Sequence, residues 1–502
     1  MGLIKNLSWR PITEKSERYN VVIFLLFAVF LFLRLYGLGK HDLWYDEIFT
    51  VNYARHPWGN WNAPLYWMLM HFWVKFAAIS EFSLRLPSAI FSFVSVILLF
   101  CLGKELFNRK TGIIAALFIG LSPFHLWYAQ EARDYSMALF FAVLSSLVFI
   151  KGIKTGERVF WLLFILVSLA GLYTDYFFTI LLLSQLLYLI ITKKIKPVIY
   201  VLLATAGFIF YIPYFLIKFV YVSRGFWLPN PGFKSLFITL SNFINGYTAP
   251  FYIYFISGLF ILTLFIIAIN LSFGKTGKDM SRSLIFCLYM WFAPLAAVFI
   301  FSKLFFSIYL DRALIIFSPC FYLFLAAVIS FAAKSISRVS ITALGLLLSV
   351  SLGAHFADGI ITPFEYHSGT YIKRPVRPIV NFLKDKFKTG DLIAFTNKSI
   401  MLSFNFYNRG RRVLYYFFDP ELPDTDCNRP EQEDGYHIGF SRIRGMSFKR
   451  LWIIALDWPR SGGLDENSKS VKAWLDENLN LEYAAAIEGA QIYRYARRTA
   501  DN

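Results

Sequence analysis

The sequence predicts a polytopic, all-α membrane protein that carries a small α/β domain at its C-terminal end. First, 57% of the 502 residues are hydrophobic and the mean hydropathy is +0.52, values far from those of a soluble domain. Second, long apolar runs recur as far as residue 357. Third, charged residues and turn signals become frequent beyond that point. We therefore predict a transmembrane domain over residues 1–357 and an α/β domain over residues 358–502.

Eleven apolar runs underlie the prediction of about eleven transmembrane helices, because a spanning helix needs roughly 20 mostly apolar residues. They cover residues 20–36, 86–103, 111–129, 135–150, 159–173, 176–192, 197–219, 251–271, 283–302, 313–333 and 339–357. A twelfth run, 63–79, contains His71 and Lys75 and begins at Asn62-Ala63-Pro64.

The distribution of Lys and Arg decides whether 63–79 crosses the membrane. If it does not cross, every inner loop carries between two and four Lys or Arg, as the positive-inside rule requires. Those loops are 1–19, 104–110, 151–158, 193–196, 272–282 and 334–338. Counting 63–79 as a span would move Lys104, Arg109 and Lys110 outside. We therefore predict that 63–79 is an amphipathic helix at the outer interface.

This topology places the N-terminus in the cytoplasm and the C-terminal domain on the extracytoplasmic side. The basic N-terminal segment and the apolar run after it resemble a signal peptide, but no small-residue cleavage site follows, so we interpret them as an uncleaved first span. In the outer domain, β-rich runs are mixed with helical patterns, which predicts an α/β fold. The strands are predicted at 391–396, 412–418, 451–456 and 491–495, and the helices at 376–386 and 470–478.

The net charge of +18 does not indicate a nucleic-acid partner, because much of the Lys and Arg lies in short loops between apolar runs. No metal site or cofactor is predicted either. The four cysteines form no CxxC pair, and the seven histidines show no paired spacing on one helix face. Asp424-Thr425-Asp426 has the Asp-x-Asp form of metal-dependent nucleotide-sugar enzymes, but no phosphate-binding glycine loop accompanies it.

Asp46 and Glu47 follow the first predicted span directly, at the outer edge of the membrane. Ionisable groups at such depths are costly unless they are solvated, paired or used. The pair could be no more than a helix start at the interface. The functional interpretation is a general base that removes a proton from an acceptor hydroxyl. Adjacent residues on a helix point about 100° apart, so only one would face a given cavity; we choose Asp46 and leave the role of Glu47 open.

Other polar candidates fall in the connections predicted to lie on the same outer side. A layer that contains carboxylate, arginine and aromatic side chains could hold a phosphate and a hydroxylated group, with Arg as the bidentate partner of the phosphate. A simpler explanation of these residues is that they form solvated turns, aromatic contacts at the membrane interface and cations that snorkel to water. The candidates for binding a phosphate or sugar are Asn62, Glu131, Arg133, Asp134, Tyr135, Asp175, Tyr176, Tyr309 and Arg312.

Several motifs in this part of the chain resemble the protein-mannosyltransferase-like glycosyltransferases of the GT-C fold, which include protein O-mannosyltransferases and the aminoarabinose transferases that modify lipid A. The resemblance holds in order and spacing over roughly residues 30–180 and is specific for the superfamily rather than for a substrate. The motifs are Arg34 to Gly39, Leu43 to Glu47, Ala63 to Tyr66, Arg85 to Ala89, Ser122 to Phe124 and Tyr128 to Ser136.

The resemblance implies a polyprenyl- or dolichyl-phosphate-linked sugar donor, transfer with inversion, Asp46 as the base, and interfacial helices in the first outer loop. It leaves open whether a hexose or pentose moves and whether the acceptor is a lipid, a glycan or a protein. We expect the chain in a bacterial inner membrane. Relatives often carry His-Pro or Lys-Pro where this chain has Ala63-Pro64, and His-Tyr where it has Asp175-Tyr176; these departures bear on donor specificity.

Two other functions are considered. A transporter or flippase of lipid-linked sugars would favour ionisable residues near the membrane midplane and inverted repeats with broken helices, whereas the predicted spans hold almost no charge and no repeat is visible. A non-catalytic scaffold would not need the clustered carboxylates and arginines.

Overall fold

The computed structural model describes residues 14–55, 62–223, 228–273, 278–357, 375–408, 415–418, 436–458, 463–487 and 489–498. The chain divides into two compact units. The helical unit comprises Met1–Leu38 and His56–Tyr371, and the C-terminal unit comprises Gly39–Arg55 and Ile372–Asn502. The connection between α1 (Glu14–Leu35) and α3 (Pro64–Phe76) is thus divided, because its segment Gly39–Arg55 belongs with the C-terminal residues. The predicted boundary at residues 357 and 358 stays a proposal.

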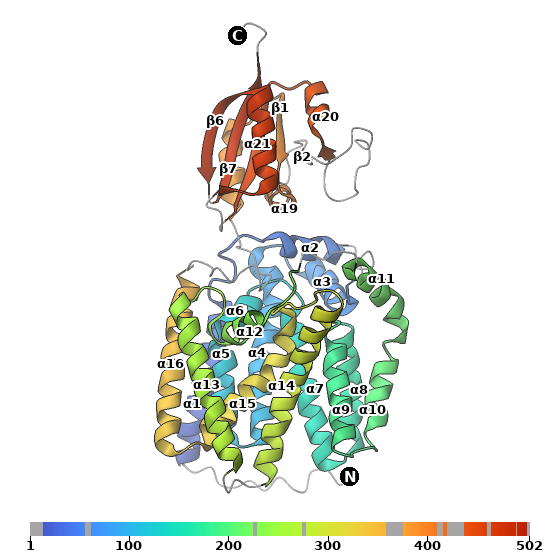
Figure 1. Ribbon diagram of the computed structural model, residues 1–502, viewed down its shortest axis with the longest axis vertical. Coiled ribbons are helices and arrows are strands. Elements are labelled where there is room, and N and C mark those ends of the chain that lie inside the picture. Colours follow the sequence, from blue (N-terminus) through green and yellow to red (C-terminus); the bar gives the residue numbers. More distant parts are fainter. Residues whose placement is uncertain are drawn as a thin grey trace. The chain divides into compact units, whose positions relative to one another are not determined.

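The helical unit is all-α, as predicted, and its long helices run side by side (Figure 1). α12 is seen nearly end-on in Figure 1 and therefore lies across the neighbouring helices. The elements are α1 Glu14–Leu35, α3 Pro64–Phe76, α4 Glu81–Leu106, α5 Arg109–Leu121, α6 Pro123–Ala129, α7 Tyr135–Thr155, α8 Arg158–Leu172, α9 Phe178–Ile191, α10 Val198–Ala206, η1 Ile209–Tyr211, α11 Ile212–Ser223, α12 Phe233–Asn245, α13 Phe251–Phe273, α14 Lys278–Leu304, η2 Ala313–Phe317, α15 Ser318–Phe331 and α16 Lys334–Phe356.

The protein is an integral membrane protein by the length and composition of these helices. Within the described residues, seven helices are long and apolar enough to cross a membrane, or up to eight if the bent pair of α5 and α6 counts as one span. Three other predicted spans correspond to apolar helices that are shorter than this, namely Asn20–Leu35, Arg158–Leu172 and Phe178–Ile191. The predicted count of eleven transmembrane helices is therefore not confirmed. α3 has 13 residues, about 20 Å, which is too short for a hydrocarbon core of about 30 Å.

The predicted span 111–129 corresponds to two helices, α5 and α6, which are bent by 61° relative to each other. Ser122 precedes Pro123 and has an extended backbone, as pre-proline residues prefer. The break frees backbone carbonyls, and the buried Arg34 guanidinium donates to two of them, those of Ile119 at 3.2 Å and Gly120 at 3.1 Å. Such compensation is what permits a broken helix in an apolar environment.

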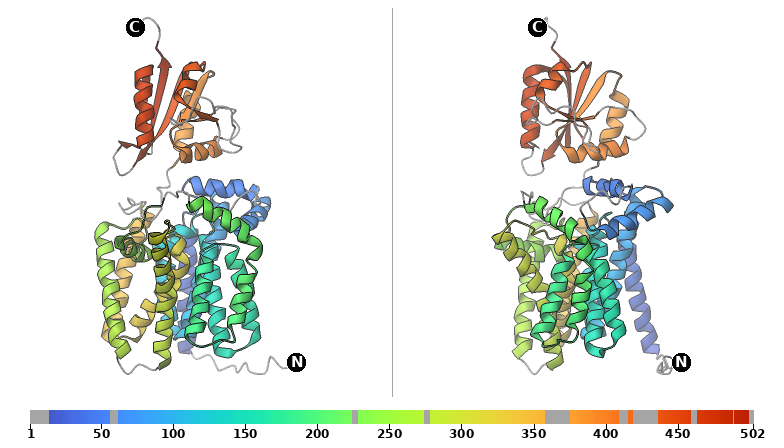
Figure 2. Two further views of the ribbon diagram at one scale, coloured as in Figure 1. Left: turned by 45° about the vertical axis from the view of Figure 1, so that its right-hand side comes forward. Right: turned by 90° about the vertical axis from the view of Figure 1, so that its right-hand side faces the viewer.

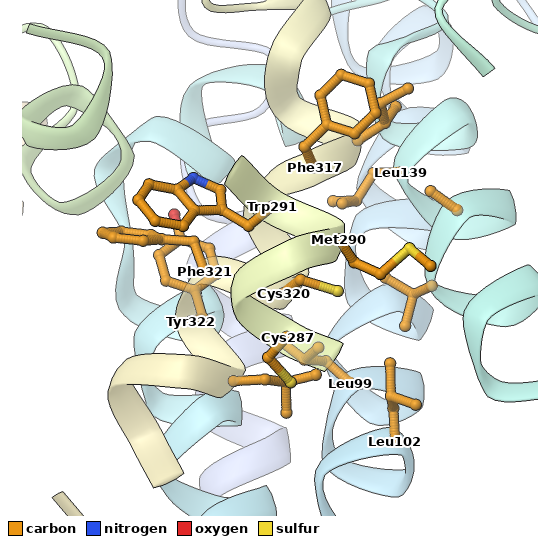
Figure 3. Close-up of a cluster of buried hydrophobic side chains, with 14 of the residues drawn as sticks. Leu99, Leu102, Leu139, Cys287, Met290, Trp291, Phe317, Cys320, Phe321 and Tyr322 are labelled. Atoms are coloured by element: carbon orange, nitrogen blue, oxygen red, sulfur yellow. The ribbon is translucent and has the colours of Figure 1, made fainter. Parts of the chain in front are cut away.

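The core of the helical unit is formed where α4, α7, α14 and α15 meet (Figure 3). Met290 of α14 lies toward Leu99 and Leu102 of α4 and Leu139 of α7, whereas Trp291 of α14 packs on Phe321 of α15, near Tyr322. Cys287 and Cys320 are free thiols buried in this cluster, where they act as small apolar side chains. This part of the interior is therefore apolar.

The C-terminal unit is a mixed sheet covered by helices on both faces (Figure 2). The strand order is β3-β2-β1-β4-β7-β6, with β5 paired to β4. β3, β2, β1 and β4 are parallel neighbours, whereas β7 runs antiparallel to β4 and β6. The elements are α2 Tyr45–Arg55, α18 Arg377–Lys386, β1 Asp391–Phe395, α19 Lys398–Tyr407, β2 Tyr415–Phe418, β3 Tyr436–Ile438, α20 Phe440–Gly445, β4 Arg450–Trp458, β5 Gly463–Leu464, α21 Glu466–Asn478, β6 Leu479–Ile487 and β7 Ala490–Arg497.

Alternating residues of the strands build the two faces of this sheet. Ile393 and Phe395 of β1 pack with α18 and α19, whereas Ala394 packs on the side of α20 and α21, as the period of two requires. The predicted α/β fold is confirmed, with strands and helices at the predicted places. The prediction missed α19, β3, α20, β5 and β6. Asp424 to Asp426 lie outside the described residues.

Candidate active site

Asp46 and Glu47 lie in the first turn of α2 and have different surroundings. Glu47 is fully buried, and its carboxylate accepts a hydrogen bond from the Trp44 backbone N–H at 3.3 Å. That bond satisfies a donor just ahead of the helix, which is the reciprocal half of a capping box. Asp46 is only partly buried. The geometry therefore gives Glu47 a role in forming the helix start and leaves Asp46 as the carboxylate that solvent reaches.

Asp42 fastens the α2 segment to α18. Its carboxylate accepts hydrogen bonds from the backbone N–H groups of Val376 at 2.7 Å and Arg377 at 2.8 Å, and it forms an ion pair with the Arg377 guanidinium. These N–H groups lie at the start of a helix, where intrahelical acceptors are lacking. The Leu43 N–H also donates to the Tyr407 hydroxyl at 2.6 Å. The loop that carries Asp46 is thus held by the C-terminal unit.

In the helical unit, the two arginines among the predicted site residues lie beside the same aromatic ring. The guanidinium of Arg133 is 5.9 Å from the centroid of Tyr135, and that of Arg312 is 5.7 Å from it. Arg133 also lies 5.2 Å from the ring of Trp67 in α3. Contacts between cations and aromatic faces hold each guanidinium in place. Residues from three separate connections of the fold therefore meet here.

Carboxylates surround these arginines, and with them form what we call the outer polar cluster: Glu131, Arg133, Asp134, Tyr135, Asp175, Asp311 and Arg312. Asp134 lies 4.0 Å from the Arg133 guanidinium. The pKa of Asp175 is raised, mainly because the carboxyl is removed from water and secondly because Asp134 is negatively charged. The Phe177 N–H, which donates to Asp175 at 2.7 Å, and the charge of Arg133 lower this pKa and so oppose the rise. Glu131 is fully buried.

The turn between α6 and α7 is fixed by bonds to neighbouring helices. The Gln130 amide donates to the backbone oxygens of Tyr36 at 2.8 Å and Leu33 at 3.2 Å, after the end of α1 and within it. Ser88 of α4 donates to the Arg133 carbonyl at 3.1 Å. The loop positions of Glu131, Arg133 and Asp134 are therefore set by α1 and α4, so the cluster is preorganised.

α12 supports the segment that carries Tyr309 and Arg312. Asn242 of α12 donates to the Asp311 carboxylate at 2.7 Å, and the Thr239 hydroxyl lies 2.8 Å from that of Tyr309. Burial raises the pKa of Asp311 to about 7, although the bond from Asn242 favours the charged form. The sequence places Asp311 in the same predicted connection as Tyr309 and Arg312, but Asp311 is not among the residues predicted to bind phosphate or sugar.

Asn62 and Tyr176 lie at a second group of aromatic side chains. The Tyr211 hydroxyl donates to the Asn62 carbonyl, and the Tyr176 ring stacks on that of Tyr211 with centroids 6.1 Å apart. Phe208 and Phe215 extend this group. Tyr176 thus packs with η1 and the helices next to it, whereas its neighbour Asp175 interacts with Asp134 and Arg133.

Among the residues that the structure describes, no group of three or more His, Cys, Asp or Glu side chains is placed to hold a metal ion. The outer polar cluster offers guanidinium, carboxylate and phenol groups. Guanidinium groups bind phosphate oxygens, and carboxylates accept from sugar hydroxyls.

Comparison with known proteins agrees with the predicted resemblance. Residues 56–217 match the family model described as Dolichyl-phosphate-mannose-protein mannosyltransferase. No curated protein matches the chain by sequence. The crystal structure of ArnT from Cupriavidus metallidurans in the apo state matches with a TM-score of 0.61 at 11% identity, covering 95% of this chain and 98% of that one.

Two further solved structures are similar. ArnT from the same organism bound to undecaprenyl phosphate gives a TM-score of 0.59 at 12% identity, covering 96% of this chain and 99% of that one. The archaeal oligosaccharyltransferase AglB from Archaeoglobus fulgidus gives 0.47 at 10% identity, covering 97% of this chain and 75% of that one. The likeness to ArnT shows the fold, and the predicted resemblance to the GT-C glycosyltransferases is confirmed.

Proposed function

We propose that this chain, which has the fold of ArnT, is a membrane glycosyltransferase that moves a sugar from a polyprenyl-phosphate donor to an acceptor on the outer face of a bacterial inner membrane. The observation that carries the proposal is the placement of Arg133 and Arg312 on the ring of Tyr135, among buried carboxylates. Two guanidinium groups in one partly dry layer suit a phosphate. The solved relative bound to undecaprenyl phosphate supports a lipid phosphate as that ligand.

In the proposed site, Arg133 and Arg312 hold the donor phosphate. Glu131, Asp134 and Asp175 accept hydrogen bonds from the sugar hydroxyls, and Asn62, Tyr176 and Tyr309 line the surrounding layer. Asp175 has a pKa above the ordinary range because it is removed from water beside Asp134. When protonated, its carboxyl can donate as well as accept. That property fits a group that faces a sugar rather than a phosphate.

In the proposed reaction, Asp46 acts as the general base. Its carboxylate takes the proton of an acceptor hydroxyl while the hydroxyl oxygen attacks the anomeric carbon. The new carbon–oxygen bond forms as the bond from that carbon to the phosphate oxygen breaks, so the configuration inverts. Polyprenyl phosphate leaves with the bonding electrons, and the arginines stabilise its developing charge. The proton on Asp46 then passes to water.

The position of buried charge argues against the transporter alternative. In the described part of the helical unit, the buried Asp, Glu and Arg side chains lie in the connections, in the last turn of α1 or in the second turn of α4. They are Arg34, Arg85, Glu131, Asp311 and Arg312. A transporter of lipid-linked sugars would instead favour ionisable groups near the midplane.

The experiment uses the purified full chain with undecaprenyl phosphate carrying radiolabelled hexoses or pentoses, together with envelope glycolipids, glycans or proteins as acceptors. We expect release of undecaprenyl phosphate only when an acceptor is present, with the label moved to that acceptor. Mass spectrometry of envelope material from a strain lacking the chain identifies the sugar and the acceptor. Movement of the intact donor between vesicle leaflets without transfer would contradict the proposal.

A further inference from the structure

α12 turns polar residues toward the protein and apolar residues outward. Ser235, Thr239 and Asn242, spaced by four and three residues, are buried on one side of the helix. Phe233 and Phe237 on the other side are 84% and 44% exposed. A helix at the surface of a soluble protein has the opposite arrangement. The polar side chains of α12 are therefore explained by the groups to which they bond, and not by contact with water.

The connection between α14 and η2 contacts this polar side of α12 through alternate residues. The Ser307 hydroxyl donates at 2.8 Å to a carbonyl of the segment that leads into α12. The Tyr309 and Thr239 hydroxyls lie 2.8 Å apart, and the Asn242 amide donates to the Asp311 carboxylate at 2.7 Å. Three successive bonds thus hold one short stretch of this connection to α12.

Arg312 follows directly after the last of these bonds. Its guanidinium lies 5.7 Å from the centroid of the Tyr135 ring, on the side of the outer polar cluster. The bond from Asn242 to Asp311 therefore fixes the chain one residue before a guanidinium that we propose as a ligand of the donor phosphate.

The C-terminal end of α12 is bonded to α6, the helix that leads to Arg133. The Ser122 hydroxyl, just before α6, donates to the Phe243 carbonyl at 2.7 Å. Near the other end of α6, the Tyr128 hydroxyl lies 2.6 Å from that of Tyr247. The connection with Arg133 starts two residues later. α12 is therefore bonded both to the helix before Arg133 and to the segment before Arg312.

Close packing also fixes this end of α12. Gly246 follows the helix with a φ of 67°, and a Cβ there would meet Pro123 at 2.8 Å. The Tyr322 hydroxyl of α15 donates to the Phe243 carbonyl at 2.6 Å. These contacts leave α12 little freedom to shift against α6, so it can act as a rigid support between the two arginines.

We infer that Thr239 and Asn242 are positioning residues for the donor phosphate. By holding the segment before Arg312, they set its guanidinium at the separation from Arg133 at which both groups reach one phosphate. Neither Thr239 nor Asn242 needs to touch the donor for this role. The inference rests on the proposed function, because it requires both arginines to bind the phosphate.

Asn242→Leu and Thr239→Val test this role, because each keeps a side chain of similar size and removes the bond. Asn245→Leu is the matched control. Asn245 is also a buried amide of α12, but it donates to Ser257 of α13 at 2.7 Å and accepts from Ser351 of α16 at 3.2 Å. Its loss disturbs the same helix without touching the bonds to the segment of Arg312.

Binding of undecaprenyl phosphate to the full chain in detergent is measured by native mass spectrometry, and melting temperatures verify that each variant is folded. We expect Asn242→Leu to weaken binding about 10- to 100-fold, the size of effect that a misplacement of about 1 Å can have. Thr239→Val should weaken binding less, and Asn245→Leu should bind as the unmodified chain does.

Two further variants separate positioning from a loss of packing. Residues that act through one group are not additive, so Asn242→Leu should cause no further loss of binding in a chain that carries Arg312→Gln. Exchanging the partners, with Asn242→Asp and Asp311→Asn together, restores an amide–carboxylate bond in the reverse direction. That exchange should recover most of the binding that Asn242→Leu loses.

Unchanged binding by the folded Asn242→Leu variant, or an equal loss in Asn245→Leu, would overturn the inference. An additive loss in the chain with Arg312→Gln would do the same. If Asn242→Leu does not fold, Thr239→Val and the exchange variant decide: weaker binding in the first and retained binding in the second support the inference, and the opposite pattern refutes it.

Failure of the proposed function gives a different result. In that case the unmodified chain does not bind undecaprenyl phosphate, or the Arg312→Gln variant binds it equally well. Either result would also remove the basis of the inference. Failure of the inference alone leaves binding by the unmodified chain and its loss in Arg312→Gln intact.

Discussion

At the scale of single residues, the outer polar cluster keeps carboxyl groups where water is scarce. Asp311 is 1% exposed, and burial raises its pKa to about 7 despite the hydrogen bond from Asn242. Such a group costs free energy when it is ionised, since the unfolded chain solvates the charge fully. The protein tolerates that cost at a place where we propose that a charged ligand binds.

The pH dependence of stability tests this burial. The folded form holds the Asp311 proton more tightly than the unfolded form, whose carboxyl pKa is about 3.9. The resulting stabilisation is complete below that value and is lost as the pH rises through about 7. Asparagine does not ionise, so Asp311→Asn does not lose this stabilisation. We expect the Tm of Asp311→Asn minus the Tm of the unmodified chain to increase by roughly 2–4 °C or more from pH 5 to pH 8. A Tm difference that does not vary with pH would contradict the buried ionisation.

Arg133 tests the phosphate contact. Its planar guanidinium lies by Trp67 and Tyr135, a geometry that a lysine ammonium does not reproduce. We expect Arg133→Lys to raise the KM for the lipid-phosphate donor about 10- to 100-fold, the worth of a charge-assisted hydrogen bond, in steady-state assays. Lys234→Gln removes an exposed cation from the start of α12 and should leave that KM unchanged. Equal effects of the two substitutions would refute a specific role for Arg133.

At the scale of elements, the anchoring of α2 to α18 and α19 gives the C-terminal unit a function. We expect Asp42→Ala to leave the Val376 and Arg377 N–H groups without their acceptor, at a cost of about 1–3 kcal/mol. The α2 segment should then exchange its amide hydrogens faster and turnover should fall. Asp385→Asn, on the exposed side of α18, should change neither. Unaltered exchange in Asp42→Ala would show that the anchor does not hold α2.

Elements with a strong local pattern were predictable from the sequence. The apolar runs, the strands β1, β4 and β7, and helices α18 and α21 all coincide with predicted segments. β6 was missed because Leu479–Ile487 follows α21 without a turn and is largely exposed. α12 was missed because a single short amphipathic helix lies inside a segment interpreted as a connection.

The site was predictable as a set of residues but not as an arrangement. Charge alternation placed Glu131, Arg133, Asp175 and Arg312 in connections on one side, and the structure brings them to one cluster. The contact of Asp42 with Arg377 joins residues 335 positions apart, and no local pattern encodes such a pair. The bend at Pro123 was readable in principle, since proline disfavours a helical residue before it.

At the scale of the whole molecule, the connection between α1 and α3 is divided between two compact units. Gly39–Arg55 carries Asp46 and belongs with the C-terminal residues, whereas α3 and the outer polar cluster belong to the helical unit. We propose different roles for these residues, with Asp46 as the base and with Arg133 and Arg312 as the ligands of the donor phosphate. A variant that removes only the base isolates that division of roles.

The most direct measurement of the central claim is the turnover of Asp46→Asn with the donor and acceptor that the unmodified chain uses, followed as release of undecaprenyl phosphate. A general base contributes about 10²- to 10⁴-fold, so we predict a fall of that size with little change in the KM for the donor. Melting temperatures confirm that the variant is folded. Turnover close to that of the unmodified chain would contradict Asp46 as the base.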